Sequence, residues 1–210
     1  MDAQNYIILN PNDIETRSFE IIEQELGHLT FPEAYAPIIK RVVHTTADFE
    51  YARITEIHKQ AINSAIEALL GGCKIYSDTR MIIAGVSKPM LKKLNCEILT
   101  YVDDPELAVA SKEKGLTRSI LGIEKAALDA DIKIYVIGNA PTALVRLTEL
   151  ILAGKANPAL VIGVPVGFVG AAESKEFIKK TNVPYIVTNG RKGGSTVAVA
   201  ILNALLYTQK

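Results

Sequence analysis

The sequence predicts an α/β protein with a mostly parallel sheet and helices on both faces, a Rossmann-like three-layer arrangement with extra N-terminal helices. From residue 74 onward, short apolar runs alternate with segments of helical periodicity, as in parallel strands joined by covering helices. Apolar residues make up 49% of the chain and aromatic residues only 6%, so aliphatic side chains must build the core, as in buried parallel strands. Polar, glycine-rich segments follow several expected strands, where such sheets bind ligands.

The first third of the chain is expected to be helical. Residues 11–27 form the first helix, because apolar side chains recur on one face at helical spacing and Gly27 can end it. A second helix is expected from Pro32 to about Val43, with His44 at its end or just beyond. A third covers residues 58–70 and is ended by two glycines.

The remaining two thirds are expected to alternate between strands and helices. Apolar runs predict strands near residues 74–77, 97–102, 132–137, 159–164 and 184–188. Helices are expected near residues 104–114, 117–129, 141–154, 171–181 and 194–207. The crossovers between parallel strands should be right-handed.

Length and charge restrict the classes of function. The 210 residues suit one domain spanning residues 1–210. Lys and Arg number 23, as do Asp and Glu, so no overall field attracts nucleic acid or an anionic membrane. The N-terminus lacks the pattern of a secretory signal, and no apolar run approaches the ~20 residues that span a bilayer. We therefore expect a cytoplasmic protein that binds neither nucleic acid nor membrane.

The cysteines and histidines match no metal-binding pattern. Cys73 and Cys96 lie far apart in the sequence and are expected to be buried or free thiols in a reducing compartment. His28 is expected near a helix end and His58 on the surface at a helix start. Without a Cys or carboxylate cluster beside them, the histidines predict no metal site.

Two glycine-rich segments invite comparison with nucleotide-binding motifs. Residues 190–195 lack the Lys-Ser/Thr pair that a Walker loop requires. They predict a tight turn that caps the last helix, an anion-cradling loop, or both, since a glycine-rich cap can expose N–H groups to an anion. The spacing of Gly163, Gly167 and Gly170 does not fit the dinucleotide fingerprint.

Arg41 and His44 are the most suggestive pair of side chains. Histidine is best suited to exchange a proton near neutral pH. If the segment is helical, the three-residue spacing puts an anion-binding guanidinium and a proton donor on one face. Spacing alone favours the structural interpretation, a helix-end histidine with a solvated arginine.

Other polar residues permit both functional and structural interpretations. Asp78, Thr79 and Arg80 follow a strand and could contact a ligand or form an internal Asp–Arg pair. Arg118 lies at a helix start and is either a ligand contact or a surface charge. Ser18 by itself would be an ordinary helix residue.

Several long segments together resemble the precorrin-8X methylmutase family, including its cobalt-precorrin-8 branch. They are IETRSFEIIEQE (14–25), RVVHTTADFEY (41–51), DTRMIIAGV (78–86), GNAPTAL (138–144), VIGVPVGFVGAAESK (161–175) and GRKGGSTVAVAILNALL (190–206). They span nearly the whole chain in the family's order, and the second and fifth are long and unusual.

The resemblance implies an isomerase of cobalamin biosynthesis. The family moves a methyl group from carbon 11 to carbon 12 of the corrin ring by a [1,5]-sigmatropic shift, and this needs no external cofactor. Precorrin-8X becomes hydrogenobyrinate, or cobalt-precorrin-8 becomes cobyrinate. The resemblance also implies a homodimer with the ligand near the subunit interface and possible handover of the product to neighbouring pathway enzymes.

The resemblance assigns roles to individual residues. The family's catalytic histidine matches His44, which would protonate or hydrogen-bond a ring nitrogen. Its substrate-contacting serine and arginine match Ser18 and Arg41. Because the substrate carries several carboxylates, further substrate contacts are expected from dispersed donors, namely Thr79, Arg80, Arg118, Arg191, Lys192 and Gly193. A non-catalytic tetrapyrrole carrier and, on the evidence of residues 190–195, a nucleotide-binding module remain alternatives.

Overall fold

A six-stranded sheet forms the centre of the described chain, in the order β1-β6-β5-β4-β2-β3. The computed structural model describes residues 10–27, 29 and 31–209. The strands are β1 (Thr55–Ile57), β2 (Lys74–Ser77), β3 (Glu97–Leu99), β4 (Ile132–Ile137), β5 (Leu160–Gly163) and β6 (Tyr185–Thr188). All neighbours pair in parallel except the edge strand β1, which is antiparallel to β6. The predicted mostly parallel sheet is confirmed.

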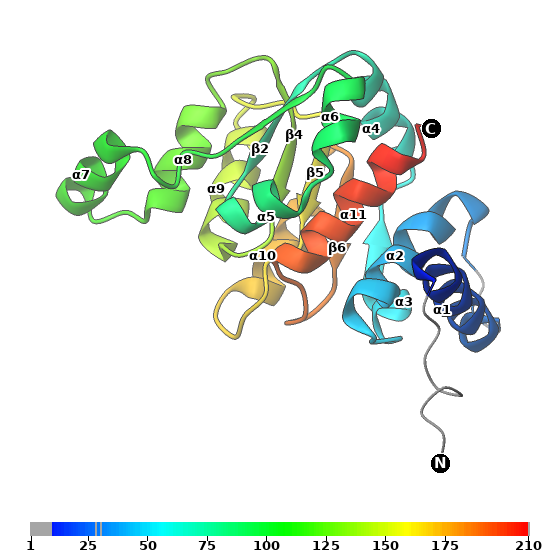
Figure 1. The fold of residues 1–210 in the computed structure, drawn as a ribbon. Helices are drawn as coiled ribbons and strands as arrows, with labels where there is room; N and C mark the ends of the chain where they lie inside the picture. Colours follow the sequence, from blue (N-terminus) through cyan, green and yellow to red (C-terminus); the bar gives the residue numbers. More distant parts are fainter. Residues whose placement is uncertain (1–9, 28, 30, 210) are drawn as a thin grey trace.

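Helices cover both faces of the sheet, as the sequence predicted (Figure 1). One face carries α1 (Pro11–Leu26), α2 (Ala36–Thr46), α4 (Ala61–Leu70), α5 (Arg80–Gly85), α6 (Lys88–Lys93) and α11 (Ser195–Tyr207). The other carries α8 (Arg118–Ala126), α9 (Pro141–Leu152) and α10 (Ala171–Ile178). Strand alternation separates the two cores: Ile134 packs toward the first set of helices and Tyr135 toward the second.

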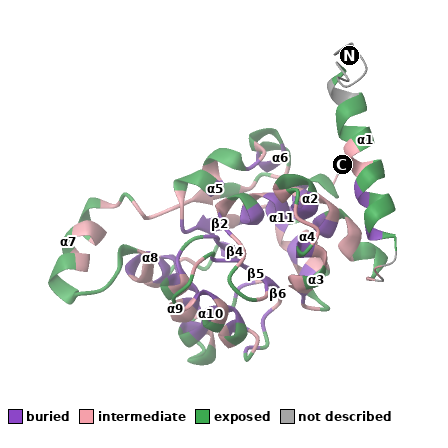
Figure 2. Ribbon diagram, turned by 90° about the horizontal axis from the view of Figure 1, so that it is seen from below, coloured by how far each residue is buried: buried purple, intermediate pink, exposed green. Residues whose placement is uncertain are grey.

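Helix α11 is the central helix of its face. It is apolar on nearly all sides and packs against α2, α5 and β5, as expected of a helix surrounded by protein. Figure 2 shows buried residues concentrated in the sheet and on the helix faces turned toward it. Helix α7 (Pro105–Lys114) instead projects from the body and contains no buried residue.

The N-terminal predictions need local correction. The segment from Pro32 begins as a 3-10 turn, η2 (Glu33–Tyr35), and α2 continues to Thr46, so His44 lies inside the helix rather than at or beyond its end. The helix expected from residue 58 begins at Ala61, and His58 precedes it. His28 lies outside the described residues.

Short elements escaped the sequence analysis. These are β1, α5, α6 and α3 (Tyr51–Ile54), which are too brief to establish a periodicity. The predicted strand 97–102 ends at Leu99, and the helices expected at 117–129, 141–154 and 171–181 end at Ala126, Leu152 and Ile178. Among the described residues, no helix combines the length and apolarity that a membrane span requires.

Candidate active site around His44

His44 opens onto a groove between three helices on the outer side of one helical layer. The groove has a volume of about 360 Å³ and is lined by α2, α5 and α11. Its lining residues are Arg41, His44, Thr45, Met81, Gly85, Thr196, Val199, Ala200, Asn203 and Tyr207. The imidazole is exposed, so it can meet a ligand without a rearrangement of the core. This mixture of apolar side chains and a few polar groups suits a large organic ligand.

Helix α1 orients the imidazole from the side. The Phe19 ring stacks on His44 with 5.1 Å between ring centroids and 14° between planes. The Arg41 guanidinium carbon lies 5.1 Å from the centroid of the same Phe19 ring. Arg41 and His44 thus share one helix face, as their spacing predicted, and one aromatic ring contacts both.

Arg41 is held loosely enough to be redirected to a ligand. Its Nη1 donates to Glu15 Oε1 at 3.1 Å, and both side chains are partly exposed. Exposed ion pairs of this kind contribute only about 0–1 kcal/mol. A substrate carboxylate could therefore replace Glu15 at little cost.

Ser18 lies on α1 beside Phe19 but does not line the groove. Its hydroxyl donates to the Ile14 carbonyl oxygen, 2.7 Å away and one turn earlier. The structure places it near the pair Arg41–His44 only through its neighbour Phe19.

A buried carboxylate organises the carboxyl end of β2. Asp78 accepts hydrogen bonds from the backbone N–H groups of Gly138, Asn139 and Ala140, at 2.9, 2.8 and 2.8 Å. Burial raises the pKa of Asp78, while these three N–H donors act in the opposite direction. The sequence analysis missed this role, although a carboxylate after a strand and a Gly-Asn-Ala-Pro helix start together signal it.

Thr79 and Arg80 have separate partners. Thr79 Oγ1 caps α5 by accepting from the Ile82 N–H, and it lies 3.0 Å from Ser195 Oγ at the start of α11. Arg80 pairs with Asp103. The internal Asp78–Arg80 pair considered from the sequence is therefore wrong, because the Asp78 oxygens are occupied by backbone donors.

The remaining expected contacts lie at the carboxyl edge of the sheet. Arg118 Nη1 donates to the Val102 carbonyl oxygen at 3.3 Å. Lys192 Nζ bonds Asp48 Oδ2 at 2.5 Å and Glu50 Oε2 at 2.8 Å, and these carboxylates raise the pKa of Lys192.

Arg191 and Gly193 lie in the same loop as Lys192. The Arg191 guanidinium carbon is 5.5 Å from the centroid of the Phe168 ring. Gly193 packs so tightly that an added Cβ would lie 2.2 Å from the Val164 carbonyl oxygen.

The predicted residues therefore form two groups. Arg41 and His44 lie in the groove, whereas Thr79, Arg80, Arg118 and residues 191–193 follow strands or begin helices at the sheet edge. The first turn of α11 joins them, since Thr196 lines the groove and Ser195 contacts Thr79. The groove residues Val199, Ala200, Asn203 and Tyr207 on the rest of α11 were not predicted from the sequence.

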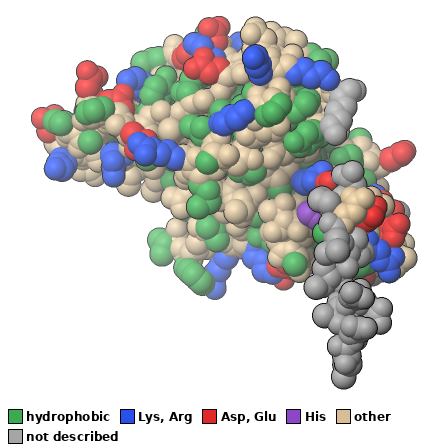
Figure 3. Space-filling view, in the orientation of Figure 1, with side chains coloured by type: hydrophobic (Ala, Val, Ile, Leu, Met, Phe, Trp, Pro, Cys, Tyr) green, Lys and Arg blue, Asp and Glu red, His purple; other side chains and the backbone are tan. Residues whose placement is uncertain are grey.

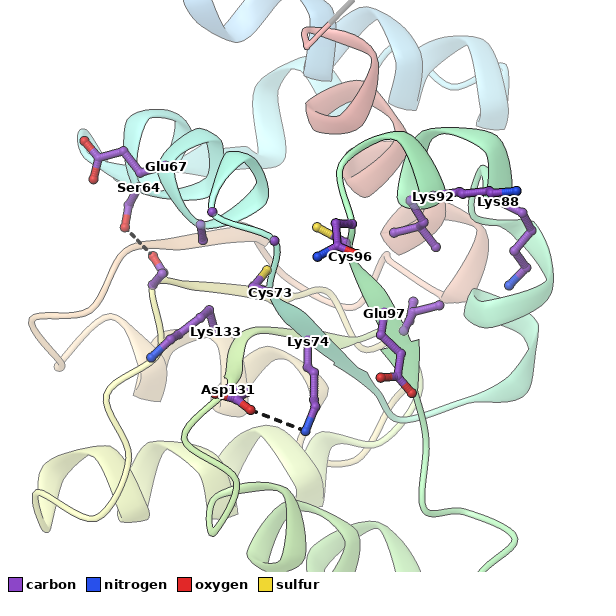
Figure 4. Close-up of a pocket in the computed structure, with 17 residues that line it drawn as sticks. Ser64, Glu67, Cys73, Lys74, Lys88, Lys92, Cys96, Glu97, Asp131 and Lys133 are labelled. Carbon is purple, nitrogen blue, oxygen red and sulfur yellow. Dashed lines mark hydrogen bonds and ion pairs between the residues drawn. The ribbon is translucent and has the colours of Figure 1, made fainter.

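A larger cavity lies at the opposite edge of the sheet. It measures about 1100 Å³ and is lined by residues that include Cys73, Cys96, Lys74 and Lys133 near the amino ends of the strands (Figure 4). Lys74 is already paired with Asp129 and Asp131. None of the predicted site residues lines this cavity, and ligands of parallel sheets bind at the other edge, so the His44 groove is the better candidate.

The fold and the groove define a three-layer α/β protein with an acid–base side chain on an open organic-ligand surface. The family model described as precorrin-8X methylmutase matches residues 13–208. The chain belongs to the precorrin-8X methylmutase family, as its resemblance indicated.

Individual relatives match over nearly their whole length. The chain is 47% identical to a cobalt-precorrin-8 methylmutase of Leptospira interrogans, with 92% of each protein covered. It is 46% identical to the enzyme of that name from Priestia megaterium, covering 95% of this chain and 88% of the relative. The crystal structure of precorrin-8X methyl mutase from Thermus thermophilus superimposes with a TM-score of 0.86 at 39% identity, covering 93% of this chain and 95% of that one.

Proposed function

We propose that this chain catalyses the intramolecular shift of a methyl group from carbon 11 to carbon 12 of a corrin precursor in cobalamin biosynthesis. The observation that carries the proposal is the exposed His44 imidazole, stacked on Phe19 beside Arg41 at an open groove. Family membership over residues 13–208 supports the reaction class.

In this proposal His44 protonates, or donates a hydrogen bond to, a ring nitrogen next to the migrating methyl group. A positive charge there draws electrons from the conjugated ring and favours migration. The methyl group never leaves the substrate, so the reaction requires neither an external acceptor nor a cofactor. A positioned acid of this kind typically accelerates a reaction about 10²–10⁴-fold.

The substrate's peripheral carboxylates would be bound by dispersed donors. We assign this role to Ser18, Arg41, Thr79, Arg80, Arg118, Arg191, Lys192 and Gly193. Several of the cations hold exposed carboxylate or carbonyl partners, which a substrate carboxylate can replace at small cost. Each charge-assisted bond to substrate would contribute about 1.5–3 kcal/mol.

We further propose cobalt-precorrin-8 as the substrate, with cobyrinate as the product. Curated relatives named cobalt-precorrin-8 methylmutase share 38–47% identity with this chain, as the enzymes of Methanocaldococcus jannaschii and Leptospira interrogans illustrate. Two named precorrin-8X methylmutase share 36% and 37%. The cobalt here belongs to the substrate and not to the protein.

The assembly is proposed to be a cytoplasmic homodimer that hands its product to the next enzyme of the pathway. The groove of about 360 Å³ is open, and a corrin with its carboxylate arms needs a further wall. A second copy can supply that wall, and exposed apolar side chains such as Phe168 and Val169 offer surface for the contact.

Conversion must be separated from mere binding, since a tetrapyrrole carrier would also bind tightly. Purified protein is mixed with cobalt-precorrin-8, and the absorption spectrum is followed over time. We expect a progressive spectral change, a product of unchanged mass, and a methyl carbon newly attached to carbon 12 by NMR. A bound spectrum that stays constant would identify a carrier and reject the isomerase.

A further inference from the structure

Lys175 is a buried lysine whose partners are all uncharged. Its side chain lies on α10 and is 0% exposed. Nζ donates to the carbonyl oxygens of Gly190 and Lys192 at 2.9 and 2.7 Å and to Thr188 Oγ1 at 3.5 Å. Burial lowers the pKa of Lys175 to about 8. Burying an ammonium group costs free energy, which its hydrogen bonds to Thr188 at the end of β6 and to the loop that follows partly offset.

The loop at residues 190–193 turns three consecutive carbonyl groups inward. Those of Gly190 and Lys192 accept from Lys175, and that of Arg191 accepts from the Gly167 N–H at 3.1 Å. The described peptide bonds are all trans, and in a trans peptide the C=O and the following N–H point in opposite directions. The N–H groups of Arg191, Lys192 and Gly193 therefore point outward.

These three N–H groups have no acceptor in the described part of the chain. Successive outward N–H groups form a concavity that binds anions. Arg191 adds a positive side chain beside the loop, whereas the Lys192 ammonium is paired with Asp48 and Glu50. The loop leads directly into α11, whose residue Thr196 lines the His44 groove three residues after Gly193.

Tight packing keeps the loop in this shape. Thr188 Oγ1 also donates to the Lys192 carbonyl oxygen at 2.8 Å, and the Gly194 N–H donates to the Val164 carbonyl oxygen at 2.8 Å. Gly193 also packs against Val164, directly after β5. The loop therefore contacts the ends of β5 and β6 and the Lys175 side chain of α10.

We propose that Lys175 is a positioning residue that fixes this loop so that its three outward N–H groups bind a peripheral carboxylate of the substrate. The proposal rests on the proposed corrin methylmutase function. Lys175 does not touch the substrate: its ammonium group binds the inner side of the loop, and the carboxylate binds the outer side.

The first arm of the test needs no substrate. Amide hydrogen exchange is measured at the Gly167 N–H in the wild type and in Lys175→Met, which keeps an unbranched side chain one atom shorter and removes the donors. We expect exchange at Gly167 to accelerate about 10-fold or more, because the inward carbonyls lose their anchor. Lys180→Met, which removes an exposed charge from the segment directly after α10, should leave it unchanged.

The second arm measures selectivity for carboxylates. Dissociation constants are determined for cobyrinate and for the same corrin with its carboxylates converted to primary amides. Lys175→Met should weaken cobyrinate binding about 10- to 100-fold, the value of one charge-assisted hydrogen bond, and barely affect the amide form. The KM should rise by a similar factor with kcat nearly constant. Lys175→Gln keeps two N–H donors and should lie between the wild type and Lys175→Met.

The outcomes separate this proposal from the function it rests on. If the Gly167 amide exchanges at the wild-type rate in both Lys175→Met and Lys175→Gln, Lys175 does not hold the loop and the proposal is overturned. If exchange is faster but the preference for cobyrinate over its amide form is unchanged, the proposal is overturned as well. If Lys175→Met does not fold, Lys175→Gln decides by the same measurements. A wild-type protein that neither binds nor converts a corrin rejects the proposed function, while the exchange arm still tests whether Lys175 holds the loop.

Discussion

At the scale of single residues, His44 combines exposure with a fixed orientation. Its ring is open to the groove, yet Phe19 stacks on it from another helix, and Arg41 contacts the same aromatic ring. Stacked aromatic pairs contribute about 0.5–1.5 kcal/mol beyond their burial, enough to favour one ring orientation. A side chain held in this way can contact a ligand without first being buried.

Replacing His44 should separate catalysis from binding. For His44→Ala we expect kcat to fall about 10²–10⁴-fold, because the acid is lost while the groove and its cations remain. The dissociation constant for cobyrinate should change only slightly. Steady-state kinetics and equilibrium titration measure the two quantities.

Two further variants sharpen that experiment. His58→Ala removes a histidine that packs against Tyr185, 5.4 Å between ring centroids, and does not line the groove; its turnover should match the wild type. His44→Asn retains a hydrogen-bond donor without an exchangeable cationic proton. Near-normal turnover in His44→Asn would show that hydrogen bonding suffices, and near-normal turnover in His44→Ala would refute the assigned role.

At the scale of elements, Asp78 ties the end of β2 to the start of α9. Its two oxygens accept three backbone N–H groups of the β4–α9 loop, and its neighbour Thr79 contacts the first residue of α11. One carboxylate thus helps fix two helix starts at the carboxyl edge of the sheet. Removing it would leave several buried N–H groups without partners.

Asp78→Asn should be strongly destabilising. The amide replaces one accepting oxygen by an NH₂ group that faces backbone donors, so we expect the free energy of unfolding to fall by about 2–4 kcal/mol. Urea denaturation followed by circular dichroism measures this. Asp103→Asn, at an exposed carboxylate paired with exposed Arg80, is the matched control and should change stability by less than about 1 kcal/mol. Equal effects of the two substitutions would contradict the assigned role of Asp78.

The amino ends of β2 and β3 bring the two cysteines together. Lys74 pairs with Glu97 in the parallel register, and the Glu97 N–H donates to the Cys73 carbonyl oxygen at 3.1 Å. Figure 4 shows Cys73 and Cys96 at one cavity. Both thiols are free, as predicted, with Cys73 buried and Cys96 partly exposed. A hydrogen bond from Cys73 lowers the pKa of Cys96.

Alkylation should therefore select Cys96. The thiolate is the reactive species, so the reaction of Cys96 with iodoacetamide should reach half its maximal rate at a lower pH in the wild type than in Cys73→Ala, where the donor is lost. Peptide mass spectrometry between pH 5 and pH 9 gives the two profiles. In Cys96→Ala, the remaining buried Cys73 should react slowly. Identical profiles in the wild type and Cys73→Ala would exclude the interaction.

Long, regular elements could be read from the sequence, and contacts between distant segments could not. The strands at 74–77 and 132–137 have the predicted bounds, because both are short apolar runs that are buried along nearly their whole length. The edge strand β1 has three residues and forms by pairing with β6.

For the candidate site, the sequence spacing indicated that Arg41 and His44 share a helix face. The stack on Phe19 and the groove residues Asn203 and Tyr207 come from opposite ends of the chain and depend on tertiary packing.

At the scale of the whole molecule, the surface is balanced in charge but uneven in apolar exposure. The formal net charge is zero, and Figure 3 shows both signs distributed over the displayed face. Adjacent apolar side chains protrude from the loop between β5 and α10, where Phe168 is 84% and Val169 is 89% exposed. Neighbouring exposed apolar residues are typical of contact surfaces, which makes this loop a candidate for the proposed dimer contact.

Substitution of the loop tip should weaken the proposed dimer. We expect the wild type to sediment as two copies and the double variant Phe168→Ser, Val169→Ser to dissociate about 10- to 100-fold more readily, because burying a large apolar side chain contributes roughly 1.5–3 kcal/mol. Analytical ultracentrifugation over a concentration series measures the dissociation constant. Leu128→Ser is the control, since Leu128 is 87% exposed and follows α8, which packs on the face of the sheet opposite to the groove. If the dimer is equally stable in the wild type, the double variant and Leu128→Ser, the interface lies elsewhere. If the wild type sediments as a single copy, the His44 groove must bind its ligand without a wall from a second subunit.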